Sequence, residues 1–454
     1  MVSEQSNIFD FIYDETYKIK KPIRLIEMFA GYGSQALALK YLGVNFEHWK
    51  IAEWAIQSIQ AYKDMHFQND DTNYSEKLSN DEVVDKLYKM GVSKDYNNPA
   101  TKEEIKRIDF RKIYNNIITT NNLVNVCNVY AKDLNIIDRE MFTYLMTYSF
   151  PCQDLSTGGK RFGMKKCSNT RSGLLWEIER ILDECEGNLP QVLLMENVPE
   201  LINQNNKKDF QEWEFKLQSL GYSNYVKVLD AKDYGIPQSR KRVFMISILG
   251  GGNYRFPKQK PLETLMFDLM EEQVDEKYYL SNKQIENIKK WNAWQKPLEQ
   301  LEKTMKNNIA PTLTARSGFY AAGMILIKNE TRVVNNYEIA PTTVNKDSMI
   351  AIPNKPQVIG GIGNKCNNDM QYHQQNKIYD NSIAISCTTS LNPYYIDYYS
   401  RIRKLTPKEY FRLMGVKDED YERVAKNQSE GSLYHLAGDS IVVNVLMAIF
   451  SKLL

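Results

Sequence analysis

A cysteine that follows an apolar stretch has the chemistry of a catalyst. The segment YSFPCQDLSTGGKRFG (148–163) predicts a strand over 144–150 that ends at Pro151-Cys152 and leads into a glycine-rich loop. Ligands of α/β proteins bind at the carboxyl ends of the strands. A single cysteine is more often a small buried apolar residue, but Pro and Gln are not apolar packing partners. We therefore interpret Cys152 as a nucleophile.

An acid and two arginines occur in segments of the same kind. Glu196 ends the apolar run over 192–195, and partial burial there would raise its pKa and suit it to share a proton. An ion-paired acid at a strand end is a comparably common alternative. Arg240 and Arg242 alternate as the strand over 242–249 begins, so both lie on one face. A solvated basic edge would have the same pattern.

A glycine-rich turn points to a cofactor. The strand over 23–28 leads into FAGYG, where Gly31 and Gly33 let a ligand approach the backbone at a helix start. This is not the GxGxxG pattern, and alone it is weak. Glu53 ends the strand over 46–52, where nucleotide-binding folds place an acid on the ribose hydroxyls, and Trp54 could stack on an adenine. The alternative is a tight turn with a surface acid.

These segments need a particular scaffold to bring them together. Strand, turn and helix alternate through the first half of the chain, which predicts an α/β fold with a doubly wound, mostly parallel sheet. A further strand is expected over 225–230. Helices are expected at 81–90, 102–118, 174–184, 209–220, 406–414 and 440–453.

The remaining regions divide the chain into domains. We expect a catalytic and cofactor-binding domain over 1–256, with a polar, Asn-rich insertion at about 64–130 that is peripheral and not catalytic. Residues 257–430 contain few strong helices after Lys306 and predict a smaller, β-rich domain. Residues 431–454 predict a C-terminal helix that returns to the catalytic domain.

Composition limits the class of protein. The chain of 454 residues has a formal net charge of +2, which leaves the choice of partner open, and 43% hydrophobic residues, typical of a globular protein. Its six cysteines form no CxxC pair, so we expect neither a metal site nor a disulfide framework. Without an apolar run of about 18 residues, we expect no membrane span and a cytoplasmic location.

In this order the motifs resemble the bacterial and phage C5-cytosine DNA methyltransferase family. The matching motifs are FAGYG, Glu53-Trp54, PCQ, ENV and QSRKR, followed by RKLTPKEYFRLMGV (403–416) and YHLAGDSIVVNV (434–445). The resemblance covers about 1–260 and 400–454. It implies the S-adenosylmethionine-dependent methyltransferase fold and methylation of carbon 5 of cytosine in duplex DNA.

The resemblance also implies a mechanism. The target base is flipped out of the duplex, and Cys152 attacks its carbon 6, which makes carbon 5 nucleophilic. Glu196 bonds ring nitrogen 3 and stabilises the charge that the attack moves there. Arg240 and Arg242 hold the thiolate, the Glu196 carboxylate or the base oxygen. Methyl transfer and loss of the carbon-5 proton then release the cysteine.

The family's cofactor site can be assigned residue by residue. Asp133 corresponds to the acid that meets the adenine amino group, although the long spacing from Phe29 to Cys152 makes its place the least certain. Asp439 stands where the family usually has Asn. The S-adenosylmethionine site that the resemblance implies comprises Phe29, Gly31, Tyr32, Gly33, Glu53, Trp54, Asp133, Leu134, Pro151, Leu175, Asp439, Ser440 and Ile441.

The expected partner is duplex DNA, contacted by Gln153, Ser156 and Gln238. The region over 258–400 is expected to recognise the target sequence, with Arg316 as the best single candidate for a base contact. Loop solvation is an equally common role for one such residue. We expect a monomer, with any cognate restriction endonuclease acting separately.

Two other functions fit part of the pattern. An RNA methyltransferase of the tRNA-modifying branch shares the core motifs, but that branch resembles a core with a reduced recognition region, and here 160 residues separate Arg242 from Arg403. A DNA-binding regulator on an inactive scaffold would not need the intact PCQ and ENV motifs. The target sequence itself cannot be deduced from these residues.

Overall fold

The computed structural model places most of the catalytic part of the chain. It describes residues 16–151, 155, 166, 171–279, 281, 307, 309–310, 312–313, 324–328, 358–361, 377–379 and 400–454. Cys152, Gln153, Ser156 and Arg316 lie outside the described residues.

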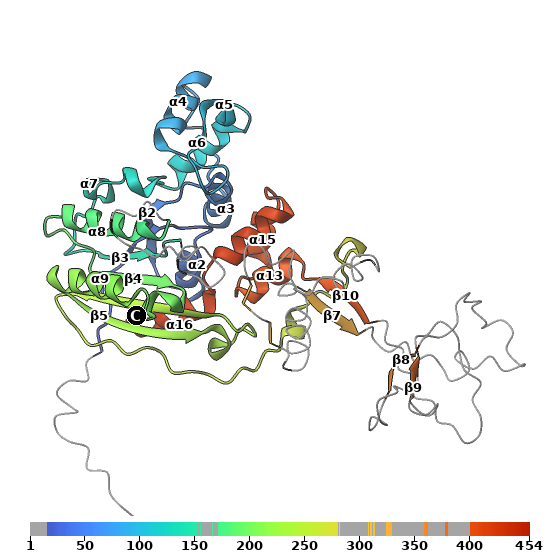
Figure 1. Cartoon of the computed structure of the whole chain (residues 1–454). Coiled ribbons are helices and arrows are strands. Elements are labelled where there is room, and N and C mark those ends of the chain that lie inside the picture. The colour runs from blue at the N-terminus through green and yellow to red at the C-terminus, as the bar shows by residue number, and fades with distance from the viewer. Residues whose placement is uncertain are drawn as a thin grey trace, which may run out of the picture. The chain divides into compact units, whose positions relative to one another are not determined.

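A six-stranded mixed sheet in the order β2-β1-β3-β4-β6-β5 forms the centre of the first unit (Figure 1). β1 pairs in parallel with β2 and β3, and β3 pairs in parallel with β4, whereas β6 runs antiparallel to both β4 and β5. This confirms the expected α/β class. The strands are β1 (Ile23–Met28), β2 (Phe46–Ala52), β3 (Thr143–Tyr148), β4 (Val192–Asn197), β5 (Tyr222–Asp230) and β6 (Lys241–Leu249).

The strand order creates a ligand-binding edge. β1 lies between β2 and β3, so the chain leaves β1 toward one side and returns on the other. Open α/β sheets bind ligands at the carboxyl ends of the strands next to such a reversal. The FAGYG turn follows β1 and Pro151 follows β3, so both segments flank this point.

Helices cover both faces of the sheet. Alternate strand residues, including Met146 and Met195, pack on α8 and α9, where Trp213 is fully buried. On the opposite face α2 packs against α16. The helices of the sheet domain are α2 (Ser34–Tyr41), α3 (Ile56–His66), α7 (Ala131–Leu134), α8 (Leu175–Glu184), α9 (Lys207–Ser219) and α16 (Val443–Leu453).

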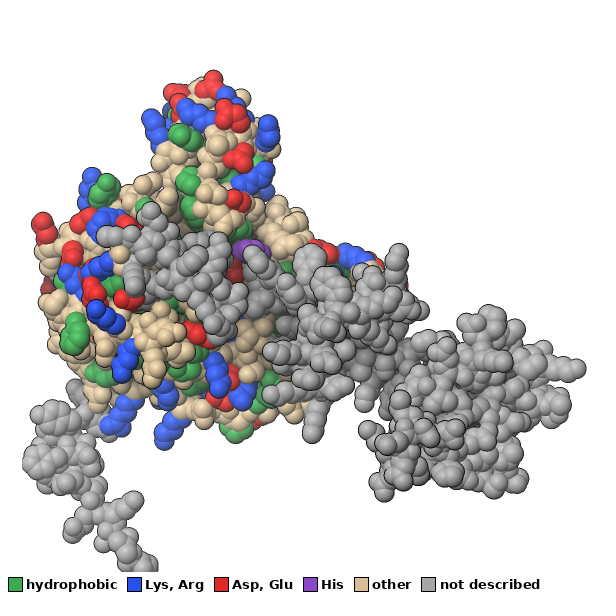
Figure 2. All heavy atoms as spheres, in the orientation of Figure 1, with side chains coloured by type: hydrophobic (Ala, Val, Ile, Leu, Met, Phe, Trp, Pro, Cys, Tyr) green, Lys and Arg blue, Asp and Glu red, His purple; other side chains and the backbone are tan. Residues whose placement is uncertain are grey.

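The insertion folds into short helices: α4 (Asn80–Met90), α5 (Lys102–Ile105) and α6 (Phe110–Thr119). Capping boxes at Ser79 and Thr101 begin α4 and α5. The single helix expected over 102–118 is therefore two helices. The apolar residues of all three pack in one cluster with Ile59 of α3 and against Trp54. The insertion therefore shares its core with the segment that follows Glu53. On its visible face acidic and basic side chains are interspersed (Figure 2).

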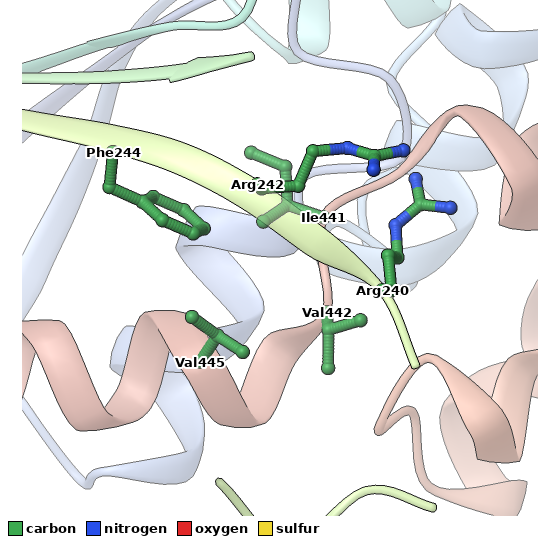
Figure 3. A pocket seen from close by; sticks show the side chains of 6 residues that line it. All are labelled: Arg240, Arg242, Phe244, Ile441, Val442 and Val445. Carbon is green, nitrogen blue, oxygen red and sulfur yellow. The ribbon is translucent and has the colours of Figure 1, made fainter. Parts of the chain in front are cut away.

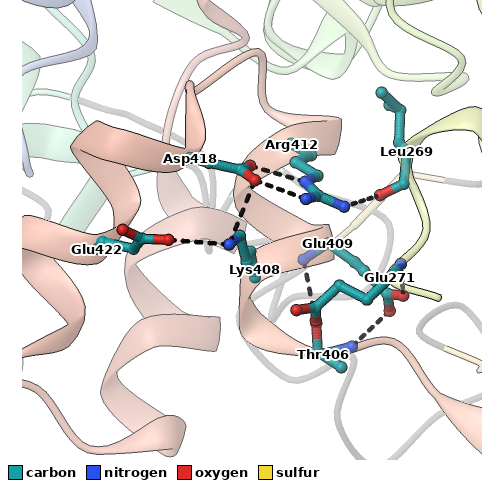
Figure 4. Close-up of polar contacts among 8 residues, drawn as sticks. All are labelled: Leu269, Glu271, Thr406, Lys408, Glu409, Arg412, Asp418 and Glu422. Carbon is teal, nitrogen blue, oxygen red and sulfur yellow. Dashed lines mark hydrogen bonds and ion pairs between the residues drawn. The ribbon is translucent and has the colours of Figure 1, made fainter. Parts of the chain in front are cut away.

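The C-terminal part comprises α13 (Pro407–Leu413), α14 (Asp418–Ala425), α15 (Glu430–Asp439) and α16. Thr406 caps α13 through Glu409, whose other oxygen accepts the backbone N–H of Glu271 at 2.9 Å (Figure 4). Arg412 donates to both oxygens of Asp418, at 2.7 and 2.6 Å, and to the Leu269 carbonyl. These bonds tie the segment around residue 270 to the C-terminal helices.

The boundaries of the compact units differ from those expected. The first unit comprises residues 1–272, 306–322 and 406–454, and the second comprises 273–305 and 323–405. Residues 406–430 belong with the sheet because buried Asp420 binds Lys40 at 2.8 Å and Tyr41 at 2.7 Å on α2. In the second unit β7 (Met324–Lys328) pairs with β10 (Ser400–Lys404), and β8 (Val358–Gly361) pairs with β9 (Lys377–Tyr379), both antiparallel.

The stretch Glu430–Leu453 is apolar and long enough by composition to cross a membrane, within the part of the chain that the structure describes. Two thirds of its most apolar window is buried inside the protein, and α15 and α16 are separate helices on either side of residues 440–442. Its apolar composition therefore serves the core of the sheet domain.

The FAGYG turn has an unusual backbone. Phe29, Gly31 and Gly33 have φ values of 61°, 56° and 82°, all in the left-handed region. Such a conformation costs a non-glycine residue roughly 1–3 kcal/mol. A Cβ on Gly33 would lie 2.6 Å from the Tyr62 ring and closer still to His66, whereas a Cβ on Gly31 would meet no described atom within 4 Å. Gly33 is thus required by space as well as by φ.

We predict that Gly33→Ala destabilises the protein more than Gly31→Ala. Backbone strain alone should cost Gly31→Ala about 1–2 kcal/mol, and Gly33→Ala adds roughly 1–3 kcal/mol of overpacking against Tyr62 and His66. Thermal unfolding of both variants without ligand measures the difference. Equal losses would mean that α3 moves aside freely.

Candidate active site

The parallel strands bring the predicted segments to one edge of the sheet. The FAGYG turn follows β1, Glu53 follows β2, Phe150 and Pro151 follow β3, and Glu196 is the penultimate residue of β4. Since β1, β2, β3 and β4 point the same way, all four carboxyl ends lie at the same edge.

Glu196 forms an ion pair with Arg242. In the antiparallel register Glu196 lies opposite Phe244, so it shares a face with Arg242, two residues away on β6. The Arg242 Nε lies 3.1 Å from a Glu196 oxygen, and the two side chains are only 16% and 10% exposed. Burial raises the pKa of Glu196, and the charges of Arg242 and Arg240 oppose that rise. The carboxyl can therefore give up or accept a proton closer to neutral pH than an exposed glutamate.

Arg240 connects three segments that are distant in sequence. Its guanidinium donates to the carbonyls of Leu313 at 2.6 Å, Gly438 at 2.9 Å and Ser440 at 2.7 Å. Because the residue is 4% exposed, these carbonyls take the place of water. In this structure Arg240 donates hydrogen bonds to backbone carbonyls, whereas Arg242 pairs with the Glu196 carboxylate.

A small cavity separates β6 from the last motif. Figure 3 shows the two arginines near each other, with Ile441 beside Arg242 and with Phe244 and Val445 further away. It is lined by Arg240, Arg242, Phe244, Ile441, Val442 and Val445. The QSRKR segment and the last motif of the sequence therefore meet at this place.

Two hydrogen bonds hold the backbone directly before Cys152. The Asn197 side chain donates to the Phe150 carbonyl at 2.9 Å, and the Ser172 hydroxyl donates to the Pro151 carbonyl at 2.8 Å. Both donors are buried. Neither was predicted as a site residue. The position of Asn197 in ENV was a signal for it, whereas nothing around Ser172 in the sequence was.

The Glu53 carboxylate is held by backbone on both sides. It accepts the Gly31 N–H at 2.9 Å and the Ala55 N–H at 2.8 Å. Asn122, at the end of the insertion, exchanges two hydrogen bonds of 3.0 and 2.9 Å with the Glu53 backbone. Burial raises the pKa of Glu53 to about 7, which these N–H groups oppose and the charge of Asp439 reinforces.

The first and last motifs approach each other at Tyr32. Burial raises the pKa of this tyrosine, and the Ser440 and Ser34 side chains beside its hydroxyl partly offset that effect. Its ring stacks on Phe411 of α13 with 5.4 Å between centroids. Ser440 and Ile441 therefore lie near the FAGYG turn.

The other predicted cofactor residues have varied surroundings. Trp54 packs against the core of the insertion. Asp133 accepts the Tyr130 N–H at 2.9 Å, and the Leu134 carbonyl accepts the Trp49 indole N–H at 2.8 Å. Leu175 is fully buried at the start of α8.

Gln238 does not have the surroundings of a DNA contact. Its side chain is fully buried, donates to the Leu413 carbonyl at 2.7 Å and accepts the Leu313 N–H at 3.3 Å. The expectation that it binds DNA is wrong for this structure, because both ends of the amide are bonded within the protein. Gln238 instead joins residues 310–313 to α13.

We predict that Arg242→Ala destabilises the protein more at pH 8 than at pH 5. Without the arginine the folded-state pKa of Glu196 rises further, and its buried, unpaired carboxylate costs roughly 3 kcal/mol where it must ionise. Near pH 5 the carboxyl is protonated, so the loss is smaller. Denaturant unfolding at both pH values measures this, with Lys241→Ala as the exposed control. A loss independent of pH would mean that the pair is unimportant.

Comparisons with known sequences identify the family of this chain. The family model for C-5 cytosine-specific DNA methylase matches residues 94–454. The Type II methyltransferase M2.ScrFI of Lactococcus lactis subsp. cremoris is 32% identical over 95% of this chain and 99% of its own. The orphan methyltransferase M.SssI of Spiroplasma monobiae is 33% identical over 95% of this chain and 97% of its own.

Solved structures show the same fold. The S. pombe Dnmt2 methyltransferase superposes with a TM-score of 0.54 at 16% identity, over 95% of this chain and 97% of that one. The family's methyl donor is S-adenosylmethionine, and its substrate is duplex DNA. The chain belongs to the C-5 cytosine-specific DNA methylases and is a DNA (cytosine-5-)-methyltransferase, of restriction-modification or orphan type.

Proposed function

We propose that this enzyme methylates a flipped-out cytosine through a covalent adduct with Cys152. The observation that carries the proposal is the pairing of buried Glu196 with Arg242. Glu196 lies on β4, next to β3, and the segment that follows β3 contains Cys152. The cysteine thiolate bonds carbon 6 and moves electrons toward nitrogen 3 and carbon 5. A base inside the duplex stack is out of reach, so the reaction requires flipping.

Glu196 stabilises the attacked ring. Its raised pKa favours the protonated carboxyl, which donates to nitrogen 3 as that atom gains charge. Arg242 holds the carboxyl at 3.1 Å and limits how far its pKa rises. Arg240 is a positioning residue, because its donors hold the Leu313, Gly438 and Ser440 carbonyls. After methylation the carbon-5 proton leaves and the sulfur–carbon bond breaks.

Asn197 and Ser172 position the nucleophile. Their hydrogen bonds fix the carbonyls of Phe150 and Pro151, the two residues before Cys152. A fixed approach of thiolate to base contributes to the rate, because misplacement of about 1 Å costs on the order of 100-fold.

S-adenosylmethionine supplies the methyl group. The chain fits it at the FAGYG turn, where Gly31 faces open space among the described residues and the Glu53 carboxylate is fixed beside it. The Glu53 carboxylate would accept hydrogen bonds from the ribose hydroxyls, and Trp54 would contact the adenine. Ser440 and Ile441 would close the site. The remaining members of the proposed site are Phe29, Tyr32, Gly33, Asp133, Leu134, Pro151, Leu175 and Asp439.

Residues 258–400 carry target recognition. Residues 273–305 and 323–405 form a unit apart from the sheet, and family members that share the sheet motifs need a separate part to choose a sequence. Arg316, Gln153 and Ser156 contribute DNA contacts. The enzyme acts in the cytoplasm as a monomer, and any cognate endonuclease works separately on the same site.

We predict that Cys152→Ala abolishes methylation without loss of cofactor binding. Duplex DNA with 5-fluorocytosine at the target should form an adduct stable to denaturation with the wild type alone, because fluorine cannot leave as the proton does. Denaturing electrophoresis detects the adduct. Cys185→Ala is the control. Cys185 is a buried cysteine at the C-terminal end of α8, so this variant should still form the adduct. Trapping by Cys152→Ala would assign the nucleophile to another residue.

We also predict that recognition can be exchanged. Replacing residues 258–400 with the equivalent region of a related enzyme should transfer the donor's target, because base edges are read there. Arg316→Ala should weaken or relax target choice in the otherwise intact enzyme. Sequencing of methylated DNA measures both. An active chimera that keeps its original target would place recognition elsewhere.

A further inference from the structure

A loop of the insertion lies against the residues that follow Glu53. The Ser93 N–H donates to the Trp54 carbonyl at 2.7 Å, and the Ile56 N–H donates to the Ser93 carbonyl at 2.9 Å. The loop after Ser93 therefore starts beside the Glu53 carboxylate. The family motifs do not include this loop, which belongs to the insertion.

The loop has a fixed conformation. Tyr96 has a φ of 62°, which is unfavourable for a tyrosine. The Asp95 carboxylate accepts the N–H groups of Asn97 at 2.8 Å and Asn98 at 2.9 Å, and the Ser93 hydroxyl donates to the Asn98 carbonyl at 2.7 Å. Hydrogen bonds on both sides of Tyr96 thus hold its strained backbone.

The Tyr96 ring stacks on a residue from the opposite end of the chain. Its centroid lies 4.2 Å from that of His435 on α15, with 16° between the ring planes. His435 Nδ1 lies 3.2 Å from a carboxylate oxygen of Asp439, one turn further along the helix and directly before Ser440. The stack joins the insertion to the last motif.

The pKa of Tyr96 responds to Asp439 and also to Glu53. Burial raises the pKa of this phenol, Ser58 offsets part of the effect by hydrogen bonding, and the charges of Glu53 and Asp439 raise the pKa further. The charge of Asp439 also raises the pKa of Glu53. Tyr96, Glu53 and Asp439 are therefore close enough to interact electrostatically, although they come from three separate segments.

We propose that Tyr96 and His435 form a clasp that closes the cofactor site beside Glu53 and slows release of the adenosine part of S-adenosylmethionine and S-adenosylhomocysteine. This proposal rests on the proposed role of Glu53 as the ribose ligand. Hydrogen bonds from Gln57 to the Lys94 carbonyl and from Gln428 to the Gln57 carbonyl also join the two segments near the stack, so only the contact between the rings has to break when ligand leaves. The insertion then helps retain the cofactor.

The test measures ligand release rather than methylation. Stopped-flow tryptophan fluorescence gives the release rate of S-adenosylhomocysteine from the full chain without DNA, and calorimetry gives its Kd. Tyr96→Ala and His435→Ala should each speed release by roughly 3- to 10-fold, the effect expected for loss of one aromatic stack. Tyr96→Phe keeps the ring and should release ligand within about twofold of the wild-type rate. Tyr88→Ala, at an exposed tyrosine of α4, is the matched control and should behave as wild type.

Two further variants make the result decisive. Combining Tyr96→Ala with His435→Ala should speed release no more than the larger single change, because both remove the same stack. Glu53→Gln should weaken binding by roughly 5- to 100-fold, the loss expected for hydrogen bonds to a charged acceptor.

Three results would overturn the clasp. These are single variants with wild-type release rates, additive effects in the double variant, or an equal effect of Tyr88→Ala, which would indicate general loosening of the insertion. If Glu53→Gln weakens binding while Tyr96→Ala does not change release, the clasp fails and the cofactor site stands. If Glu53→Gln also binds normally, the proposed cofactor site itself is wrong.

Discussion

The hydrogen bonds of Arg240 hold together the parts of the chain from which the active site is built. One buried guanidinium binds carbonyls of residues 73, 198 and 200 positions away in sequence. Without it the buried carbonyls of Leu313 and Gly438 would lose this partner, at a cost of about 1–3 kcal/mol each. Arg240 thereby keeps the last motif against β6, where Ser440 reaches Tyr32 and Ile441 borders the arginine cavity.

Two buried carboxyls at the same sheet edge are held in different ways. Glu196 is paired with a guanidinium, whereas Glu53 is bonded to backbone N–H groups and feels the charge of a second acid, Asp439. Burial raises the pKa of both. The cation next to Glu196 suits a carboxyl that handles a proton during reaction, and the N–H groups around Glu53 fix its orientation toward a neutral ligand such as a sugar hydroxyl.

The insertion is part of the structure around the FAGYG turn and Glu53. Asn122 fixes the Glu53 backbone, Ser93 pairs with the residues around Trp54, and Ile59 of α3 lies in the insertion's core. A polar surface and a small apolar core coexist in this segment, since its helices are amphipathic. Its polar composition gave no sign of what the buried face touches.

The sequence by itself determined the fold class, the strands and the residues of the motifs, because strand period, turn glycines and strand-end acids are local signals. The helix expected over 406–414 matches α13, which Thr406 caps. Only the tertiary structure decided that Gln238 is buried, that Arg240 binds backbone and that residues 406–430 pack on α2 through Asp420. These outcomes depend on contacts between segments far apart in the chain. A polar side chain has the same local pattern whether it meets DNA, a carbonyl or water, and the partner is fixed by packing alone.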